Sequence, residues 1–278
     1  MERSAVTSNN LVAEEYLAEC RRHLAKIYTG FRALEKGGAN IDEDQLNRTF
    51  RAVHALKGAG FFGLVKIREL AHQTEEAFKL IRSRHVVATP TEARILLSAH
   101  ETLDDLIRNP ATSNEADATA ILVALAKMSA IHRGPSSPVA EAAAGARRIQ
   151  VLLAEDDAPA RLTLETFFAP YGDCDVAVDG KQAVDTFRAS WDLGKRYDLI
   201  CMDVLMPEMD GREAVRQVRA YELSHGVFPW DGAKIIMASA MGDMKEVVLC
   251  FNEFCDAFLV KPLDLNKLLN HLTSYRLV

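Results

Sequence analysis

The 278-residue chain lacks several features that would place it in common protein classes. No apolar run approaches the ~20 residues that span a bilayer, so we expect no membrane insertion. The segment from Met1 to Asn10 is too polar for a secretory signal. The net charge is -6 and no long basic run is present, which argues against nucleic-acid binding. The five cysteines lack metal-ligand spacing, which is typical of reduced thiols in a cytoplasmic protein.

What the sequence does contain is enough apolar residues, 49% of the chain, to build sizeable cores in about two domains. The clearest boundary is the stretch 133–146, where prolines, glycines and small residues form no periodic apolar face. We interpret this stretch as a flexible linker. It would separate a helical domain at 1–132 from an α/β domain at 147–278.

The first domain reads as helical throughout. Apolar residues at helical spacing predict helices over 11–34, from Asp42 or Asp44 towards Gly58, over 65–84, from Pro90 to about Arg108, and from Ser113 or Asn114 to about 131. The loops between them are short, which favours antiparallel neighbours in a bundle.

The second domain changes to short apolar runs. These runs predict strands over 149–154, 175–178, 198–202, 234–238 and 257–260, with amphipathic helices between them. The alternation indicates an α/β fold with a doubly wound, five-stranded parallel sheet. Ligands of such sheets bind at the carboxyl ends of the strands.

Acidic residues follow two of these strands. Glu155 and Asp156 come directly after the first strand, and Asp203 ends the third. These two strand ends lie side by side in a doubly wound sheet, so we expect the three carboxylates to converge. Oxygen ligands without cysteine or histidine favour Mg²⁺, which would neutralise a phosphoryl group and align it with a carboxylate nucleophile.

Two further groups end the remaining strands. Ser239 ends the fourth strand and offers a hydroxyl to a phosphoryl oxygen, and Lys261 ends the fifth and offers a positive charge. Pro262 follows Lys261, and an X-Pro bond in a tight turn is a candidate cis peptide. Acidic pairs often serve only as helix caps, but chance rarely places all these groups at one sheet edge.

In the first domain, one histidine has a lysine close by in the sequence, as a phosphoryl-accepting histidine requires. His54 and Lys57 are three residues apart, so both would lie on one exposed face of a helix. A lone histidine there is usually only a solvated polar residue. The other histidines of the domain lack a following Lys-Gly pair, and His72 is the only serious rival. A surface histidine and an acidic pocket on one chain suggest phosphoryl transfer between His and Asp.

Residues 148–273 resemble a two-component receiver domain. The resemblance implies these roles: phosphoacceptor for Asp203, an acidic pair around Mg²⁺ for Glu155 and Asp156, a backbone-carbonyl metal ligand for Leu205, a switch hydroxyl for Ser239, a switch aromatic for Phe258, and the active-site lysine for Lys261. The chain departs from the usual pattern twice, with Glu155 in place of aspartate and Phe258 in place of tyrosine.

Residues 11–131 resemble a histidine phosphotransfer domain, particularly that of chemotaxis-type kinases. The matching stretch runs from Phe50 through Gly58 to Glu75. The resemblance implies that His54 is the phosphorylated residue, with Lys57 beside it. It also implies that Glu75 or His72 hydrogen-bonds the other ring nitrogen of His54 and fixes its tautomer.

The leading hypothesis is a phosphorelay protein that passes phosphoryl groups through His54 and Asp203. A separate histidine kinase and a downstream receiver or response regulator would be the partners, and the linker would permit an intramolecular contact. The chain shows no glycine-rich ATP lid and only a short tail after 273, so we expect neither kinase activity nor an output domain. The alternatives are a binding module, in which phosphorylation of Asp203 alters docking around Phe258, and a phosphate sink.

The sink can be separated from the relay by the lifetime of the phosphoaspartate. Leu205 and Met241 lie two residues beyond Asp203 and Ser239, where side chains hold or block the attacking water. Both are apolar and bulky, so we expect slow hydrolysis, which suits a relay.

Overall fold

The computed structural model describes residues 2–37, 42–83, 88–133, 148–229, 231–240, 244–252 and 255–278. The chain divides into two compact units, Met1–Ser137 and Pro138–Val278. Nearly all of the predicted linker, together with His85 and Met241, lies outside the described residues. Within the described ranges, none of the helices combines the length and apolar character needed to cross a membrane.

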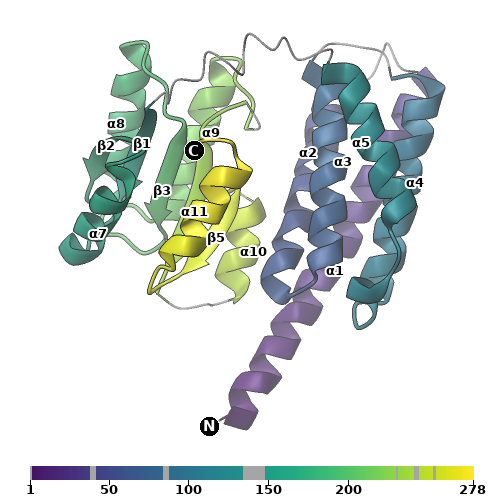
Figure 1. Ribbon diagram of the computed structural model, residues 1–278, viewed down its shortest axis with the longest axis horizontal. Helices are drawn as coiled ribbons and strands as arrows, with labels where there is room; N and C mark the ends of the chain where they lie inside the picture. Colours follow the sequence, from purple (N-terminus) through teal and green to yellow (C-terminus); the bar gives the residue numbers. More distant parts are fainter. Residues whose placement is uncertain are drawn as a thin grey trace. The chain divides into compact units, whose positions relative to one another are not determined.

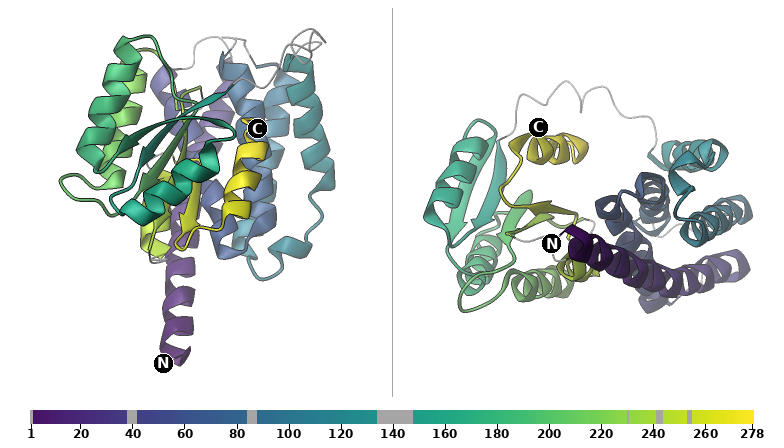
Figure 2. Two further views of the ribbon diagram at one scale, coloured as in Figure 1. Left: turned by 60° about the vertical axis from the view of Figure 1, so that its left-hand side comes forward. Right: turned by 90° about the horizontal axis from the view of Figure 1, so that it is seen from below.

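The N-terminal unit is a helical bundle (Figure 1), as predicted. Its elements are α1 (Glu2–Gly37), α2 (Glu43–Ala55), the 3-10 helix η1 (Leu56–Phe62), α3 (Val65–Ser83), α4 (Pro90–Arg108), the 3-10 helix η2 (Ser113–Glu115) and α5 (Thr119–Arg133). Helix α1 packs against α2 and α4, and α3 packs against α2, α4 and α5. Figure 2 shows these helices side by side from two further directions.

Local sequence signals set the starts of two helices as predicted. The side chain of Asp42 accepts a hydrogen bond from the amide of Asp44 at the start of α2, at 3.2 Å. Thr89 and Glu92 form a capping box around Pro90: the Glu92 amide donates to Thr89 Oγ1 at 3.3 Å, and the Thr89 amide donates to Glu92 Oε2 at 2.7 Å.

Two predicted boundaries were wrong. Helix α1 begins at Glu2 rather than near residue 11. The last helix does not start at Ser113 or Asn114: those residues form η2, and α5 begins at Thr119. The reason is a tertiary contact, because the Asn114 side chain accepts from the Lys66 amide at 3.2 Å and donates to the Gly63 carbonyl at 2.8 Å. Asn114 therefore fastens the turn to the start of α3 rather than capping α5.

Helix α2, which carries His54, lies unusually close to α1. A Cβ built on Gly30 would fall within 2.7 Å of three side-chain atoms of the buried Thr49. Phe50, Val53 and Leu56 then fill the bundle core, each with an exposed fraction of 1% or less. The predicted buried face of this segment is confirmed.

The C-terminal unit is a five-stranded parallel sheet in the order β2-β1-β3-β4-β5. The strands are β1 (Ile149–Ala154), β2 (Gly172–Ala177), β3 (Leu199–Asp203), β4 (Lys234–Ser239) and β5 (Ala257–Val260). The doubly wound α/β fold is therefore confirmed. Strand β2 begins earlier than predicted because it pairs with β1 along its whole length, from Gly172 opposite Ile149.

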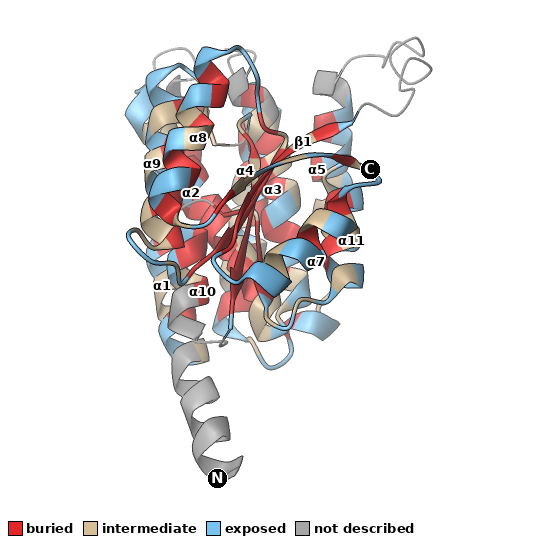
Figure 3. Cartoon of the chain, turned by 90° about the vertical axis from the view of Figure 1, so that its left-hand side faces the viewer, coloured by how far each residue is buried: buried red, intermediate tan, exposed pale blue. Residues whose placement is uncertain are grey.

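Helices cover both faces of this sheet. They are α7 (Ala158–Phe168), α8 (Gly180–Asp192), α9 (Gly211–Ser224), α10 (Met244–Asn252) and α11 (Leu265–Ser274). Figure 3 shows α7 and α11 on one side of the buried strands and α8 and α9 on the other. Leu164 and Phe168 of α7 and Leu268 and Leu272 of α11 join the strand residues in one core. This core aligns the carboxyl ends of the strands at one edge.

Candidate functional site

Three carboxylates meet at the carboxyl edge of the sheet, as predicted. One oxygen from each of Glu155, Asp156 and Asp203 lies within 4.8 Å of the others. Glu155 and Asp203 are buried, whereas Asp156 is exposed. The convergence follows from sheet topology, because β1 and β3 are neighbouring parallel strands whose ends coincide.

Lys261 brings a positive charge into this cluster. Its Nζ donates to Glu155 Oε1 at 2.7 Å and to Asp203 Oδ2 at 2.5 Å. Burial works against the charge, but the hydrogen bonds to Asp203 and Glu155 outweigh it and raise the pKa of Lys261 above its usual value. Burial, together with the nearby charge of Asp203, raises the pKa of Glu155 despite its bond to Lys261. The cluster thus holds a charged lysine between crowded carboxylates.

The remaining predicted positions also lie near this edge. The Lys261 amide donates to the Ser239 carbonyl at 2.8 Å, so β5 carries the lysine directly beside the end of β4. Ser239 is 3% exposed and Phe258 is also buried. The Lys261-Pro262 bond is cis, as the sequence suggested.

Two contacts at this edge could not be predicted from the sequence. The amide of Leu205 donates to Asp203 Oδ1 at 3.2 Å, while its side chain is 64% exposed. Nη1 of Arg161, on α7, donates to the carbonyls of Glu155 at 2.8 Å and Asp156 at 3.3 Å. Both contacts involve backbone groups, which every residue possesses, so residue identity could not reveal them.

The donor set at this edge fits a hard divalent cation. The cluster consists of three carboxylates without cysteine or histidine, so its ligand atoms are all oxygens. Its two buried carboxylates, Glu155 and Asp203, carry more negative charge than the positive charge of Lys261 can balance. Mg²⁺ prefers such ligands and keeps several waters, which the exposed side of Asp156 permits.

His54 lies in the last turn of α2, but it is not on an exposed face. The residue is only 4% exposed, so the prediction of a surface histidine was wrong. The reason is the side chains that α3 and η1 bring against it. His54 Nδ1 lies 3.1 Å from Glu75 Oε1, and Lys57 Nζ lies 3.1 Å from Glu75 Oε2. Between the two residues considered for the ring contact, Glu75 makes it, and His72 lies exposed on α3.

Glu75 is ionised in this arrangement. Burial alone would raise its pKa, but the charge of Lys57 and the contacts of His54 outweigh burial and hold the pKa well below its ordinary value. An ionised carboxylate accepts a proton donor on each oxygen. His54 Nδ1 therefore carries the hydrogen in the neutral ring, and Nε2 carries the lone pair.

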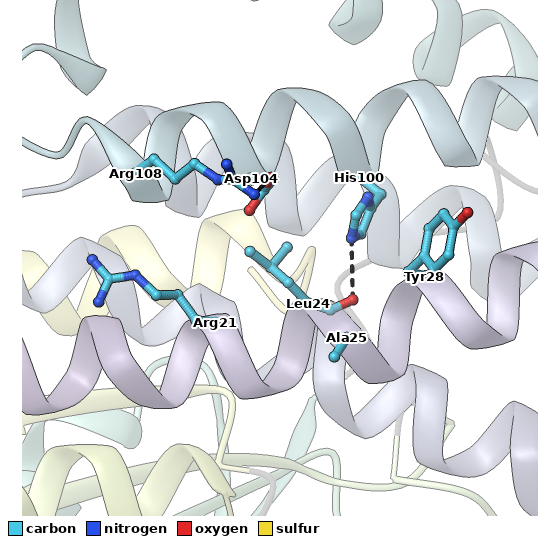
Figure 4. A pocket seen from close by; sticks show the side chains of 7 residues that line it. All are labelled: Arg21, Leu24, Ala25, Tyr28, His100, Asp104 and Arg108. Carbon is cyan, nitrogen blue, oxygen red and sulfur yellow. Dashed lines mark hydrogen bonds and ion pairs between the residues drawn. The ribbon is translucent and has the colours of Figure 1, made fainter.

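His100 belongs to a different place on the bundle. It lines a pocket of about 550 Å³ between α1 and α4, with Tyr28 and two arginines (Figure 4). Its Nε2 lies 3.1 Å from the Leu24 carbonyl, which ties the ring to α1, and burial lowers the pKa of His100. The His54–Glu75 contact joins α2 to α3 instead.

Comparison with known proteins assigns each half to a family. Residues 12–109 match the Hpt domain family, and residues 151–273 match the response regulator receiver domain family. The chain is 33% identical over 98 residues to chemotaxis protein CheA of Rhizobium meliloti, covering 35% of this chain but only 13% of that protein. It is 31% identical over 121 residues to chemotaxis protein CheY of Listeria monocytogenes, covering 44% of this chain and 93% of that protein.

The likeness to solved structures is weaker. One contains the histidine phosphotransfer signaling protein Ypd1 of Saccharomyces cerevisiae and the receiver domain of its downstream response regulator Ssk1, with 26% identity and a TM-score of 0.41 over 46% of this chain and 88% of that one. The assignment rests on the sequence matches: the chain belongs to the two-component phosphorelay proteins, with an Hpt domain followed by a response regulator receiver domain.

Proposed function

We propose that His54 and Asp203 carry the phosphoryl group in this phosphorelay protein. Its upstream partner would be a separate histidine kinase, and its downstream partner would be a receiver or response regulator. The observation that carries the proposal is the contact of His54 Nδ1 with Glu75 Oε1 at 3.1 Å. It leaves Nε2 as the nucleophilic nitrogen of a ring held in one tautomer.

The surroundings of His54 support attack on phosphorus. As the bond from Nε2 to phosphorus forms, the bond from phosphorus to the donor breaks and its electron pair leaves with the donor. The ring gains positive charge, which the carboxylate of Glu75 stabilises through Nδ1–H. Lys57, held on the other oxygen of Glu75, supplies a positive charge beside the ring for the phosphoryl oxygens.

Asp203 is the proposed acceptor in the receiver. Its carboxylate oxygen attacks phosphorus, the bond from phosphorus to the donor breaks, and the electron pair leaves with the donor, such as the imidazole of a phosphohistidine. Lys261 already contacts Asp203 Oδ2 and remains charged near the phosphoryl group. The hydroxyl of Ser239, at the end of β4, donates to a phosphoryl oxygen.

Mg²⁺ is the cofactor that these residues fit. Glu155, Asp156, Asp203 and the carbonyl of Leu205 would hold it, and when bound it neutralises charge on the phosphoryl oxygens. With it, the receiver would promote its own phosphorylation by small donors and its own dephosphorylation. Both matched families are phosphotransfer modules rather than kinase domains.

We place the domain boundaries at 1–132 and 147–278, with a linker at 133–146. The division of the chain into units between Ser137 and Pro138 falls inside this linker and supports it. A linker of this length raises the effective concentration of each domain near the other, so intramolecular transfer between His54 and Asp203 is part of the proposal.

A labelling experiment tests the two positions. The intact chain is treated with radiolabelled acetyl phosphate and Mg²⁺, and the label is tested in acid and in base. Label that is lost in acid but stable in base marks phosphohistidine, and base-labile label marks acyl phosphate. Wild type should carry base-labile label, His54→Gln should keep it, and Asp203→Asn should lose it. Undiminished label in Asp203→Asn would place the acceptor elsewhere. Acid-labile, base-stable label in wild type that disappears in both variants would show transfer from Asp203 to His54.

A further inference from the structure

Tyr16 of α1 contacts the backbone that joins His54 to Lys57. Its hydroxyl lies 3.1 Å from the carbonyl oxygen of Ala55 and 3.0 Å from that of Leu56. Ala55 and Leu56 are the two residues between His54 and Lys57. A carbonyl only accepts, so the single hydroxyl hydrogen is shared between these two oxygens. One side chain from another helix thus bonds to both peptide carbonyls that set the spacing of the two functional side chains.

This backbone is not a regular α-helix. Ala55 has φ -58° and ψ -28°, Leu56 has φ -68° and ψ -18°, and η1 begins at Leu56. These angles are close to those of a 3-10 helix, in which side chains three residues apart stand in line. In an α-helix the same two side chains would be turned away from each other by about 60°. The tighter turn therefore brings His54 and Lys57 into line with the two oxygens of Glu75.

Tyr16 is itself held firmly in place. Its ring is 3% exposed and stacks on Phe62 at the end of η1, with 4.5 Å between ring centroids and 16° between ring planes. Burial and the neighbouring Cys20 thiol raise the pKa of the Tyr16 hydroxyl well above its ordinary value, and a backbone hydrogen bond from Ala59 acts in the opposite direction. The hydroxyl therefore remains a donor throughout the physiological range.

We propose that Tyr16 is a positioning residue for phosphoryl transfer at His54. Its hydroxyl stabilises the tight turn that lets His54 and Lys57 reach the two oxygens of Glu75 together. The inference rests on the proposed role of His54. It adds a residue of α1 that bonds to the backbone between His54 and Lys57 and acts through that backbone.

The test uses Tyr16→Phe in the full chain, which keeps the ring on Phe62 and removes only the hydroxyl. Nitrogen-15 NMR of labelled histidine reports the tautomer of His54 in folded molecules, a property that a general loss of stability would not change. We expect a single Nδ1–H tautomer in wild type and a mixture in the variant. Tyr28→Phe, which removes a hydroxyl from a half-exposed ring of the same helix, should match wild type.

A rate measurement complements the spectrum. Phosphoramidate serves as a small donor whose phosphorus–nitrogen bond breaks, with loss of ammonia, as Nε2 attacks. We expect labelling of His54 to be about tenfold slower in Tyr16→Phe, the order of a small misplacement of reacting groups. In a Lys57→Met background the same change should cause little further loss, because Tyr16 acts through the His54–Lys57 spacing.

Four outcomes would count against the proposals. An unchanged tautomer with an unchanged rate, or equal losses in both backgrounds, would refute the positioning role. Base-stable, acid-labile labelling of His54→Gln at the wild-type rate would instead refute the proposed function, whatever Tyr16 does. If Tyr16→Phe does not fold, Phe62→Leu removes the ring that supports Tyr16, and a wild-type tautomer in that variant would count against the proposal.

Discussion

Glu75 is the residue on which the N-terminal site depends most, because one buried carboxylate receives both His54 and Lys57. Its neighbours depress its pKa, so its ionised form is favoured by folding. At the other site, Asp203 has the comparable position, with Lys261 on one oxygen and the Leu205 amide on the other. In both sites a partner holds the functional group before any phosphoryl group arrives.

Glu75→Gln should destabilise the Hpt domain at neutral pH by about 1–3 kcal/mol, because Lys57 would lose its buried anionic partner. The depressed pKa fixes the sign of the pH effect. The contribution of Glu75 is complete above its unfolded pKa of about 4.3 and is lost as the pH falls through the lower folded value. Hydrogen exchange of α2 and α3 in the intact chain should therefore differ between wild type and variant at pH 7, and differ less below pH ~4. An equal difference at both pH values would contradict this account.

Leu205→Asn should shorten the lifetime of the phosphoaspartate. The Leu205 side chain is 64% exposed and its contact with Asp203 uses the backbone amide, so the change leaves that contact and the fold intact. A polar side chain there would hold an attacking water that leucine excludes. Decay of base-labile label should be several-fold faster than in wild type, with Leu205→Met as the matched control. A wild-type lifetime of only seconds would favour the phosphate sink.

At the scale of elements, the crossing of α1 over α2 sets where His54 lies. Gly30 permits the close approach, since a Cβ there would overlap Thr49, and Tyr16 bonds the end of α2 from the same helix. In the receiver, Gly211 plays a similar part, because a Cβ on it would lie 1.9 Å from the Asp203 carbonyl oxygen. Close approaches at glycines thus position both proposed phosphoryl carriers, His54 and Asp203.

Gly30→Ala should destabilise the helical unit by about 1–3 kcal/mol through overpacking against Thr49. Thermal unfolding of the intact chain, followed by far-UV circular dichroism, measures the loss. Thr49→Ala removes two of the three overlapping atoms, so adding it to Gly30→Ala should recover part of the stability. If the double variant were less stable than the sum of the two single variants, the overlap would not be the cause.

At the scale of the molecule, the chain contains two units, and the stability of the receiver can be measured separately from that of the helical unit. Both tryptophans, Trp191 and Trp230, lie in the C-terminal half, so tryptophan fluorescence reports the receiver alone. The crowded carboxylates of that unit make it the part whose stability should depend on Mg²⁺.

Mg²⁺ at a hundredfold excess over its Kd should stabilise the receiver against urea by about 2.7 kcal/mol, seen by tryptophan fluorescence. Asp156→Ala should abolish this gain, and because Asp156 is exposed the change should cost little stability without the ion. Asp157→Ala, which alters a neighbouring helix cap, is the control that should retain the gain. A full Mg²⁺ effect in Asp156→Ala would place the ion away from this cluster.

The sequence alone was sufficient for the order of elements and for the acidic edge. The helical repeat of apolar residues and the short apolar runs are properties of the local sequence, so they predicted the helices and strands. Parallel strands align their carboxyl ends at one edge, so Glu155, Asp203 and Lys261 could be placed together because each lies at the end of a strand. The cap at Asp42 and the capping box at Thr89 are local as well.

Only the tertiary structure decided the surroundings of His54. Whether its ring is exposed, and whether Glu75 or His72 reaches it, depends on how α3 is rotated against α2, and the spacing of residues along one helix carries no information about the next. The contacts of Tyr16, Arg161 and Asn114 were hidden for a related reason: each binds backbone groups, which are the same at every position, so only the fold selects which of them a side chain meets.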